Sequence, residues 1–136
     1  MSYSNPRQLW MSRELTLNGA SDLETFFAPL NRVVIHKIGM MPTNNAAGGA
    51  TCVFEKRQVA TTDATIETVT IPAADHQGDV IYTEILAGFV LVPGDRVNIA
   101  VTEGGTAPTA LALIEYSIDD YNLVNDGTSG VAIVSA

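Results

Sequence analysis

The clearest strand of this chain lies in its second half, where apolar and polar residues alternate. Val97, Ile99 and Val101 are separated by polar or small residues over 96–102. A period of two is typical of a strand that turns one face to the core and the other to water. We therefore expect a half-buried strand at these residues.

Turn signals on both sides of this strand predict two neighbours for it. Pro93-Gly94-Asp95 predicts a type II turn, because Pro presets φ at the first central position and Gly accepts the positive φ at the second. The glycine-containing sequence 103–108 interrupts the pattern again, and an apolar run resumes at 109–118. The whole segment from Phe89 to Ser117 is therefore predicted to be an antiparallel meander of three strands.

Residues 30–41 are apolar on both faces of a predicted strand. Val33 and Ile35 lie on one parity, and His36 shares the other parity with apolar neighbours. Such a strand is covered on both sides, and in a sandwich the opposite sheet supplies only one of the two covers. Another subunit is expected to supply the second, which makes Val33, Ile35 and His36 candidate subunit-interface residues.

A hairpin is predicted between 30–41 and 51–59, because the uncharged loop between them is rich in turn formers. In this hairpin His36 lies opposite Lys56, while Cys52 faces the core. Cys52 is then four residues from His36 along the strands, roughly 13 Å, which is too far for a Cys–His dyad.

Shorter signals predict local irregularities. The inward phase of the apolar residues shifts near Glu67 or Thr68, which predicts a β-bulge. Ala87-Gly88 predicts a break or kink before the meander. Ser21-Asp22-Leu23-Glu24 matches a capping box and predicts one short helical turn through Phe27.

These elements indicate an all-β chain, an antiparallel β-sandwich of jelly-roll type with about eight strands and one short helical turn. The composition agrees, since 14 Thr, 13 Val and 10 Ile in 136 residues favour a pleated surface. We expect an N-terminal arm at 1–8, the sandwich domain at 9–118 and a C-terminal extension at 119–136.

Charge excludes some classes of partner. Fifteen acidic residues against seven basic ones give a formal charge of −8, which repels nucleic acid and anionic membranes. We see no secretory signal and no apolar run near the roughly 20 residues that span a bilayer, so a soluble protein is expected. Cys52 is the only cysteine, which excludes an intrachain disulfide and fits assembly in a reducing cytosol.

Candidate chemistry is sparse. Cys52 is the one possible thiol nucleophile, with His36 and His76 as possible bases, but a cysteine within a strand is usually a small buried hydrophobe. No Gly-x-Ser-x-Gly elbow is present, and neither Gly-Gly pair is followed by the lysine of a phosphate-binding loop. We therefore expect no catalytic residues, no cofactor and no enzymatic activity.

Two polar clusters could contribute to a cation site, but neither has the alternating oxygen spacing and central glycine of an EF-hand loop. They are Asp75, His76 and Asp79 in one loop, and Asp119, Asp120, Asn122 and Asp126 near the C-terminus. Solvated loop polarity explains both, so no metal is expected.

The run from VLVPGDRVNIAVTEGG to ALALIEYS, with the earlier VVIHKIGMMPTNNAAGGATCVFEKR, resembles the small jelly-roll decoration or cement proteins of tailed-bacteriophage heads. The resemblance is one of size, pattern and turn placement over most of 9–118. It implies a non-enzymatic virion protein, made in the host cytoplasm, that binds outside an assembled capsid and stabilises it. Its implied partners are the major capsid protein and two further copies of itself in a homotrimer.

An irregular N-terminal arm is expected to make the shell contacts, through Tyr3, Arg7, Leu9 and Trp10, because these side chains have no obvious burial of their own. Trp10 could instead plug the core. The main alternative function is a glycan-binding fibre head or carbohydrate-binding module, whose sites commonly expose aromatic rings. A scaffold subunit of another assembly is a third possibility.

Overall fold

The computed structural model describes residues 6–45, 48–58, 64–105 and 107–119, and in these residues the chain forms eight strands and no helix. The strands are β1 (Arg7–Thr16), β2 (Ala20–Phe27), β3 (Val33–Pro42), β4 (Ala50–Arg57), β5 (Ala64–Ile71), β6 (Ile81–Leu91), β7 (Arg96–Glu103) and β8 (Thr109–Ile118). The expected all-β class is confirmed. With no helix in the described part, none is long and apolar enough there to cross a membrane.

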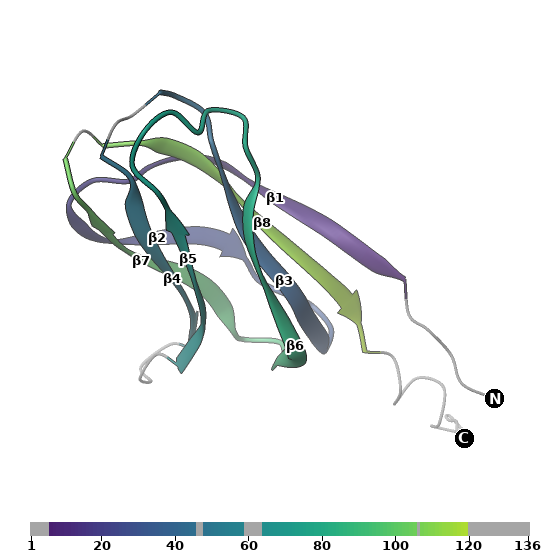
Figure 1. Ribbon diagram of the computed structural model, residues 1–136. Coiled ribbons are helices and arrows are strands. Elements are labelled where there is room, and N and C mark those ends of the chain that lie inside the picture. Colours follow the sequence, from purple (N-terminus) through teal and green to yellow (C-terminus); the bar gives the residue numbers. More distant parts are fainter. Residues whose placement is uncertain (1–5, 46–47, 59–63, 106, 120–136) are drawn as a thin grey trace, which may run out of the picture.

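The strands form two antiparallel sheets that pack face to face (Figure 1). Sheet A has the order β1-β8-β3-β6, and sheet B has the order β2-β7-β4-β5. Consecutive strands lie in different sheets, with β4 and β5 as the exception. This alternation is the jelly-roll arrangement, so the sandwich expected from the sequence is confirmed.

The core lies between the two sheets. In β7 the side chains of Val97, Ile99 and Val101 point into it, as their alternation predicts. Phe54 from β4, the neighbouring strand in sheet B, and Ile114 from β8 in sheet A are fully buried in the same cluster. A large-to-small change at such a position costs about 2–5 kcal/mol.

The meander predicted for Phe89 to Ser117 is wrong. Its three strands alternate between the sheets, because β6 pairs with β3, β7 pairs with β2 and β4, and β8 lies between β1 and β3. The turn itself forms as expected: Gly94 has a φ of 102°, and the Asp95 amide donates to the Val92 carbonyl at 3.0 Å. The turn carries the chain from one sheet to the other, because turn residues specify a reversal and not the strand that pairs.

The hairpin predicted between 30–41 and 51–59 is wrong for the same reason. β3 pairs with β6 and β8, whereas β4 pairs with β5 and β7. Cys52 therefore pairs with Val69 and Val101 in sheet B, and His36 lies in sheet A.

The helical turn predicted after Ser21 is also wrong, because these residues form β2. Pairing of β2 with β7 supplies the backbone hydrogen bonds that a lone helical turn leaves unmade. The register skips Thr25 and Phe26, so β2 ends in a bulge. Tertiary pairing here overrides a capping signal of four residues.

The residues predicted at a subunit interface belong mainly to the interior. Val33 is 3% exposed and Ile35 is 0% exposed within a single chain, so neither is available to a neighbour. The register of β3 shifts between Ile35 and Lys37 against both of its partners, which makes His36 an extra residue in a bulge. After the bulge, the residues that point into the core change from odd to even positions. This change explains why both sets of positions are apolar, and no second subunit is needed to cover the strand.

Two smaller predictions are confirmed in place. Phe54 pairs with Glu67 and Glu55 pairs with Thr65, so Ile66 is an extra residue in β5. This bulge lies one position from the bulge predicted near Glu67. Gly88 has a φ of 73° and lies in a bulge of β6 opposite His36, so the predicted kink falls within one continuous strand.

Candidate binding surfaces

Cys52 cannot act as a nucleophile in this environment. Its side chain is fully buried between the sheets, and burial raises the pKa of the thiol to about 12. Only the thiolate attacks, and it is scarce at neutral pH when the pKa is this high. Cys52 is a small core residue.

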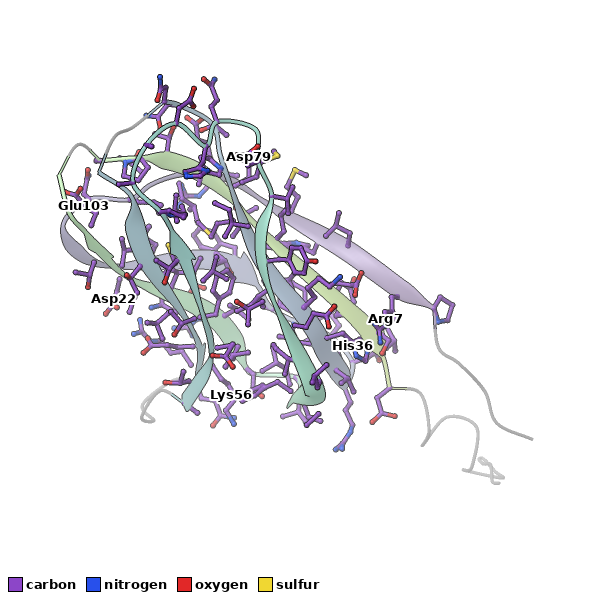
Figure 2. All side chains as sticks on the ribbon, in the orientation of Figure 1. Arg7, Asp22, His36, Lys56, Asp79 and Glu103 are labelled. Carbon is purple, nitrogen blue, oxygen red and sulfur yellow. The ribbon has the colours of Figure 1, made fainter. Side chains whose placement is uncertain are left out.

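His36 lies in the β3 bulge at the same end of the sandwich as Arg7, as Figure 2 shows. Its Nε2 atom is 2.7 Å from the Ser117 hydroxyl on β8. Desolvation lowers the pKa of the imidazole, nearby Arg7 lowers it further, and Glu115 partly opposes both. The arrangement favours a neutral histidine that bridges two strands.

The loop between β5 and β6 satisfies its own polar groups. His76 Nδ1 is 3.2 Å from Asp79 Oδ2, and Asp75 accepts a bond from the Gln77 amide at 3.0 Å. No group of three metal-ligating side chains occurs in the described residues. Asp120, Asn122 and Asp126 of the second cluster lie outside those residues.

One row on the outer face of sheet A has no charged residue on any of the four strands. Strand register places one row of side chains over all four strands: Met11, Leu113, Gly39 and Tyr82. The row beside it mixes one apolar residue with charges: Leu9, Glu115, Lys37 and Glu84. An antiparallel sheet usually turns a polar face to water, so this face departs from the common pattern.

Gly39 makes a hollow in the middle of this face. Gly39 and Leu113 form the floor, Leu9 rises on the β1 side at 64% exposure, and Tyr82 rises on the β6 side at 55% exposure. The resulting space, which we name the sheet A groove, has a volume of about 280 Å³. Lys37 crosses it with its Nζ atom 4.7 Å from the Tyr82 ring centroid.

A second apolar surface lies where β1 and β2 run along one side of the sandwich. In β2, the Thr25 hydroxyl donates to the Val97 carbonyl at 2.6 Å and accepts from the Phe27 amide at 3.1 Å. These two bonds replace part of the interrupted ladder and fix the bulge. The Phe26 side chain is left pointing outward.

Phe26 is held in a conformation that phenylalanine rarely adopts. Its φ of 67° is in the left-handed region, which costs a non-glycine residue about 1–3 kcal/mol. The ring is 65% exposed, Leu30 nearby is 89% exposed, and the Arg13 guanidinium lies 5.5 Å from the ring centroid. The surrounding bonds, not the preference of Phe26, maintain this geometry.

Behind Phe26 is an aromatic cluster with a cavity of about 270 Å³. Phe27 makes edge-to-face contacts with Trp10 and Tyr116, each with ring centroids 5.2 Å apart. We name this surface the aromatic corner, and define it by Trp10, Phe26, Phe27, Leu30 and Tyr116.

The three predicted shell-contact residues within the described part do not form an irregular arm. Arg7, Leu9 and Trp10 lie in β1, and Tyr3 is outside the described residues. Arg7 pairs with Glu115 at 3.1 Å, Trp10 packs against the core, and only Leu9 borders the sheet A groove. The sequence analysis missed Gly39, Tyr82 and Phe26; a glycine inside a strand is the one signal that could have indicated a hollow.

The molecule is thus a jelly-roll sandwich with two exposed apolar surfaces. No family model matches the chain, and no curated protein matches it. One similar solved structure is the Eiger TNF from S. frugiperda, with 11% identity and a TM-score of 0.39; the match covers 65% of this chain and 59% of that chain. Another is from a study of Bacillus endospore appendages, described as a novel family of disulfide-linked pili, with 15% identity, a TM-score of 0.41 and coverage of 88% and 97%. TM-scores this low carry no argument about the function of this chain.

Proposed function

We propose that this chain is a non-enzymatic structural protein that takes its place in a larger protein assembly. The observation that carries the proposal is the concentration of its exposed apolar side chains. Nine large apolar side chains are exposed in the described part. Leu9, Val80 and Tyr82 line the sheet A groove, and Met11 lies beside its floor residue Leu113. Phe26 and Leu30 belong to the aromatic corner. Clustered apolar exposure of this kind marks protein contacts, and two such surfaces suit a subunit with several neighbours.

The assembly that we propose is the outside of a bacteriophage capsid, with the major capsid protein and further copies of this chain as partners. A repeated lattice multiplies modest contacts, because an oligomer that touches several shell subunits must release all of them to dissociate. The formal charge of −8 fits a position outside the shell, away from nucleic acid.

Co-sedimentation with empty phage shells tests this proposal. We expect saturable binding with a fixed ratio of this protein to shell subunits, and shells that withstand higher temperature once decorated. Absence of saturable binding would contradict the capsid assignment. A chain lacking residues 1–6 keeps β1 intact, so reduced occupancy at an unchanged melting temperature would assign shell contacts to residues 1–6.

Glycan binding is the second candidate, and the aromatic corner is the observation that favours it. Sugar rings stack on exposed aromatic side chains, and Trp10, Phe26 and Tyr116 line the same cavity. A glycan array would support this function if hits disappear on Phe26→Ala. No hits, together with saturable shell binding, would leave the structural role alone.

A further inference from the structure

We propose that the aromatic corner of one copy docks into the sheet A groove of a second copy. This inference rests on the proposed function, because it names the contact through which copies of this chain associate. The contact is edge to face: the β1–β2 side of one sandwich meets the outer face of sheet A in the next.

Shape is the first reason. The groove is concave, with its floor at Gly39 and its walls at Leu9 and Tyr82. If two such faces met about a two-fold axis at their centre, floor would lie opposite floor and a void would remain between them, which close-packed interfaces avoid. A concave surface needs a projecting side chain from its partner, and Phe26 and Leu30, at the rim of the aromatic-corner cavity, are exposed enough on the same chain to provide one.

The conformation of Phe26 is the second reason. Bulges in edge strands prevent unwanted strand pairing, and the bulges of β1 and β2 do this for the side of the sandwich. That role explains the bulge, but glycine would fill the same position without strain. A large aromatic ring held outward in the left-handed region is instead what a docking contact requires, since aromatic side chains dominate interface energies.

Charge is the third reason. In the described part, Arg13 is the one arginine without a carboxylate within ion-pair distance; the paired ones are Arg7, Arg32, Arg57 and Arg96. The outer face of sheet A carries three carboxylates against two cations, namely Glu14, Glu84 and Glu115 against Arg7 and Lys37. Glu84 keeps an accessible carboxylate among these, because its side chain is 53% exposed and its ion pair with Lys37 is long, at 3.9 Å. When Phe26 docks, Arg13 of the same copy comes close to Glu84 on the other copy, and the two side chains can form an ion pair.

The two surfaces differ, so the contact between copies is heterologous. Such a contact repeats from copy to copy until rotation closes a ring, and otherwise it extends as a filament. Closure after three copies gives the homotrimer that the capsid resemblance implies.

Sedimentation velocity without phage shells tests the contact with two variants. Phe26→Gly removes the convex side chain, and Leu9→Glu places a charge on the groove wall at a side chain that is already exposed. We expect the wild-type chain to form closed oligomers and each variant to be monomeric. An equimolar mixture should form a 1:1 heterodimer, because the intact corner of the Leu9→Glu copy meets the intact groove of the Phe26→Gly copy.

Leu86→Glu is the matched control, because Leu86 is an exposed leucine on β6 that lines neither surface. It should leave the oligomer unchanged. Thermal melting separates docking from folding: glycine relieves the strained φ, so Phe26→Gly should melt at a higher temperature than a monomeric Leu9→Glu reference while it fails to assemble.

Three results would overturn the inference: a monomeric wild-type chain, an oligomer that survives Phe26→Gly, or variants that stay monomeric when mixed. The shell experiment keeps this failure apart from failure of the proposed function. A monomer that binds shells overturns only the contact between copies. An oligomer that ignores shells overturns only the capsid assignment.

Discussion

The two sheets of this sandwich have the same strand number and the same antiparallel pairing, but their outer faces differ in chemistry. Sheet A presents the apolar row of Met11, Leu113, Gly39 and Tyr82. Two rows cross the outer face of sheet B: Asp22, Ala100, Val53 and Thr68, and beside them Glu24, Asn98, Glu55 and Thr65. The rows on sheet B carry several polar and charged side chains, whereas the row on sheet A carries no charge.

Sheet B also pairs its charges within the chain. Glu24 accepts from Arg96 at 2.8 Å, and Asp22 lies 3.4 Å from Arg57. Partly exposed pairs of this kind contribute only about 0–1 kcal/mol each. The fold therefore does not decide the chemistry of each outer face; the residues that the register aligns on the outside do.

The largest effect is expected in the core between the two sheets, in the rate at which a thiol reagent labels Cys52. Because burial raises the pKa of Cys52 to about 12, the folded protein at pH 8 holds almost none of this thiol as reactive thiolate. A thiol reagent should therefore label the folded chain at the rate of unfolding and label it at once in denaturant. Fast labelling of the folded chain would contradict this prediction, because it would mean that the two sheets separate enough to expose Cys52.

A larger side chain at Gly39, on the groove floor, should destabilise the protein much more than a larger side chain at Ala100 on the outer face of sheet B. A Cβ at Gly39 would meet the Ile81 carbonyl oxygen at 3.0 Å and the Tyr82 Cβ at 3.2 Å. Gly39→Val should therefore cost about 1–3 kcal/mol in urea unfolding, as overpacking usually does. Ala100→Val on the half-buried outer face of sheet B is the control and should stay within about 0.5 kcal/mol. Equal losses at both positions would contradict the difference in packing.

Sequence reasoning recovered the features that are local. Alternation in 96–102 gave the strand and its buried side, and Pro93-Gly94-Asp95 gave the turn, because both signals are complete within a few residues. The strand content and the jelly-roll class follow from such signals added along the chain.

Pairing is not local, and here the sequence analysis failed. Nothing within the segment from Phe89 to Ser117 shows that β7 leaves the sheet that holds β6 and β8. A single bulge at His36 reversed the parity of the following residues and imitated a strand with two apolar faces. The error put Val33 and Ile35 at an interface, whereas both are core residues.

The candidate surfaces were the least predictable part. The groove combines Leu9, Gly39 and Tyr82, which are far apart in sequence and meet only through the register of sheet A. Phe26 was assigned to a helical turn, so its outward position in a bulge could not be anticipated. Long-range register, and not residue type, creates both surfaces.

The cations on the two faces should respond differently to salt. A double-mutant cycle should give about 0.5–1 kcal/mol between Lys37 and Tyr82 on sheet A, where the ammonium lies over a ring. The Arg57–Asp22 pair on sheet B should give about 0.2–1 kcal/mol. Molar salt should nearly abolish the second coupling and preserve more of the first, because the apolar stem of the lysine also packs on the ring. Equal loss in both cycles would contradict this distinction.

The smallest effect expected is a pH dependence that belongs to sheet A alone. Burial and Arg7 hold the pKa of His36 below its ordinary value of about 6.5, while Glu115 opposes them. The unfolded chain therefore binds a proton more readily than the folded chain, so stability should be constant above about pH 6.5 and fall as the pH drops below it. The slope should be small, because the imidazole is only half-buried, and it should vanish in His36→Gln, whose amide can still reach the Ser117 hydroxyl. Urea midpoints measured between pH 7.5 and pH 5.5 check this, and a slope that persists unchanged in the variant would show that the titrating group lies elsewhere.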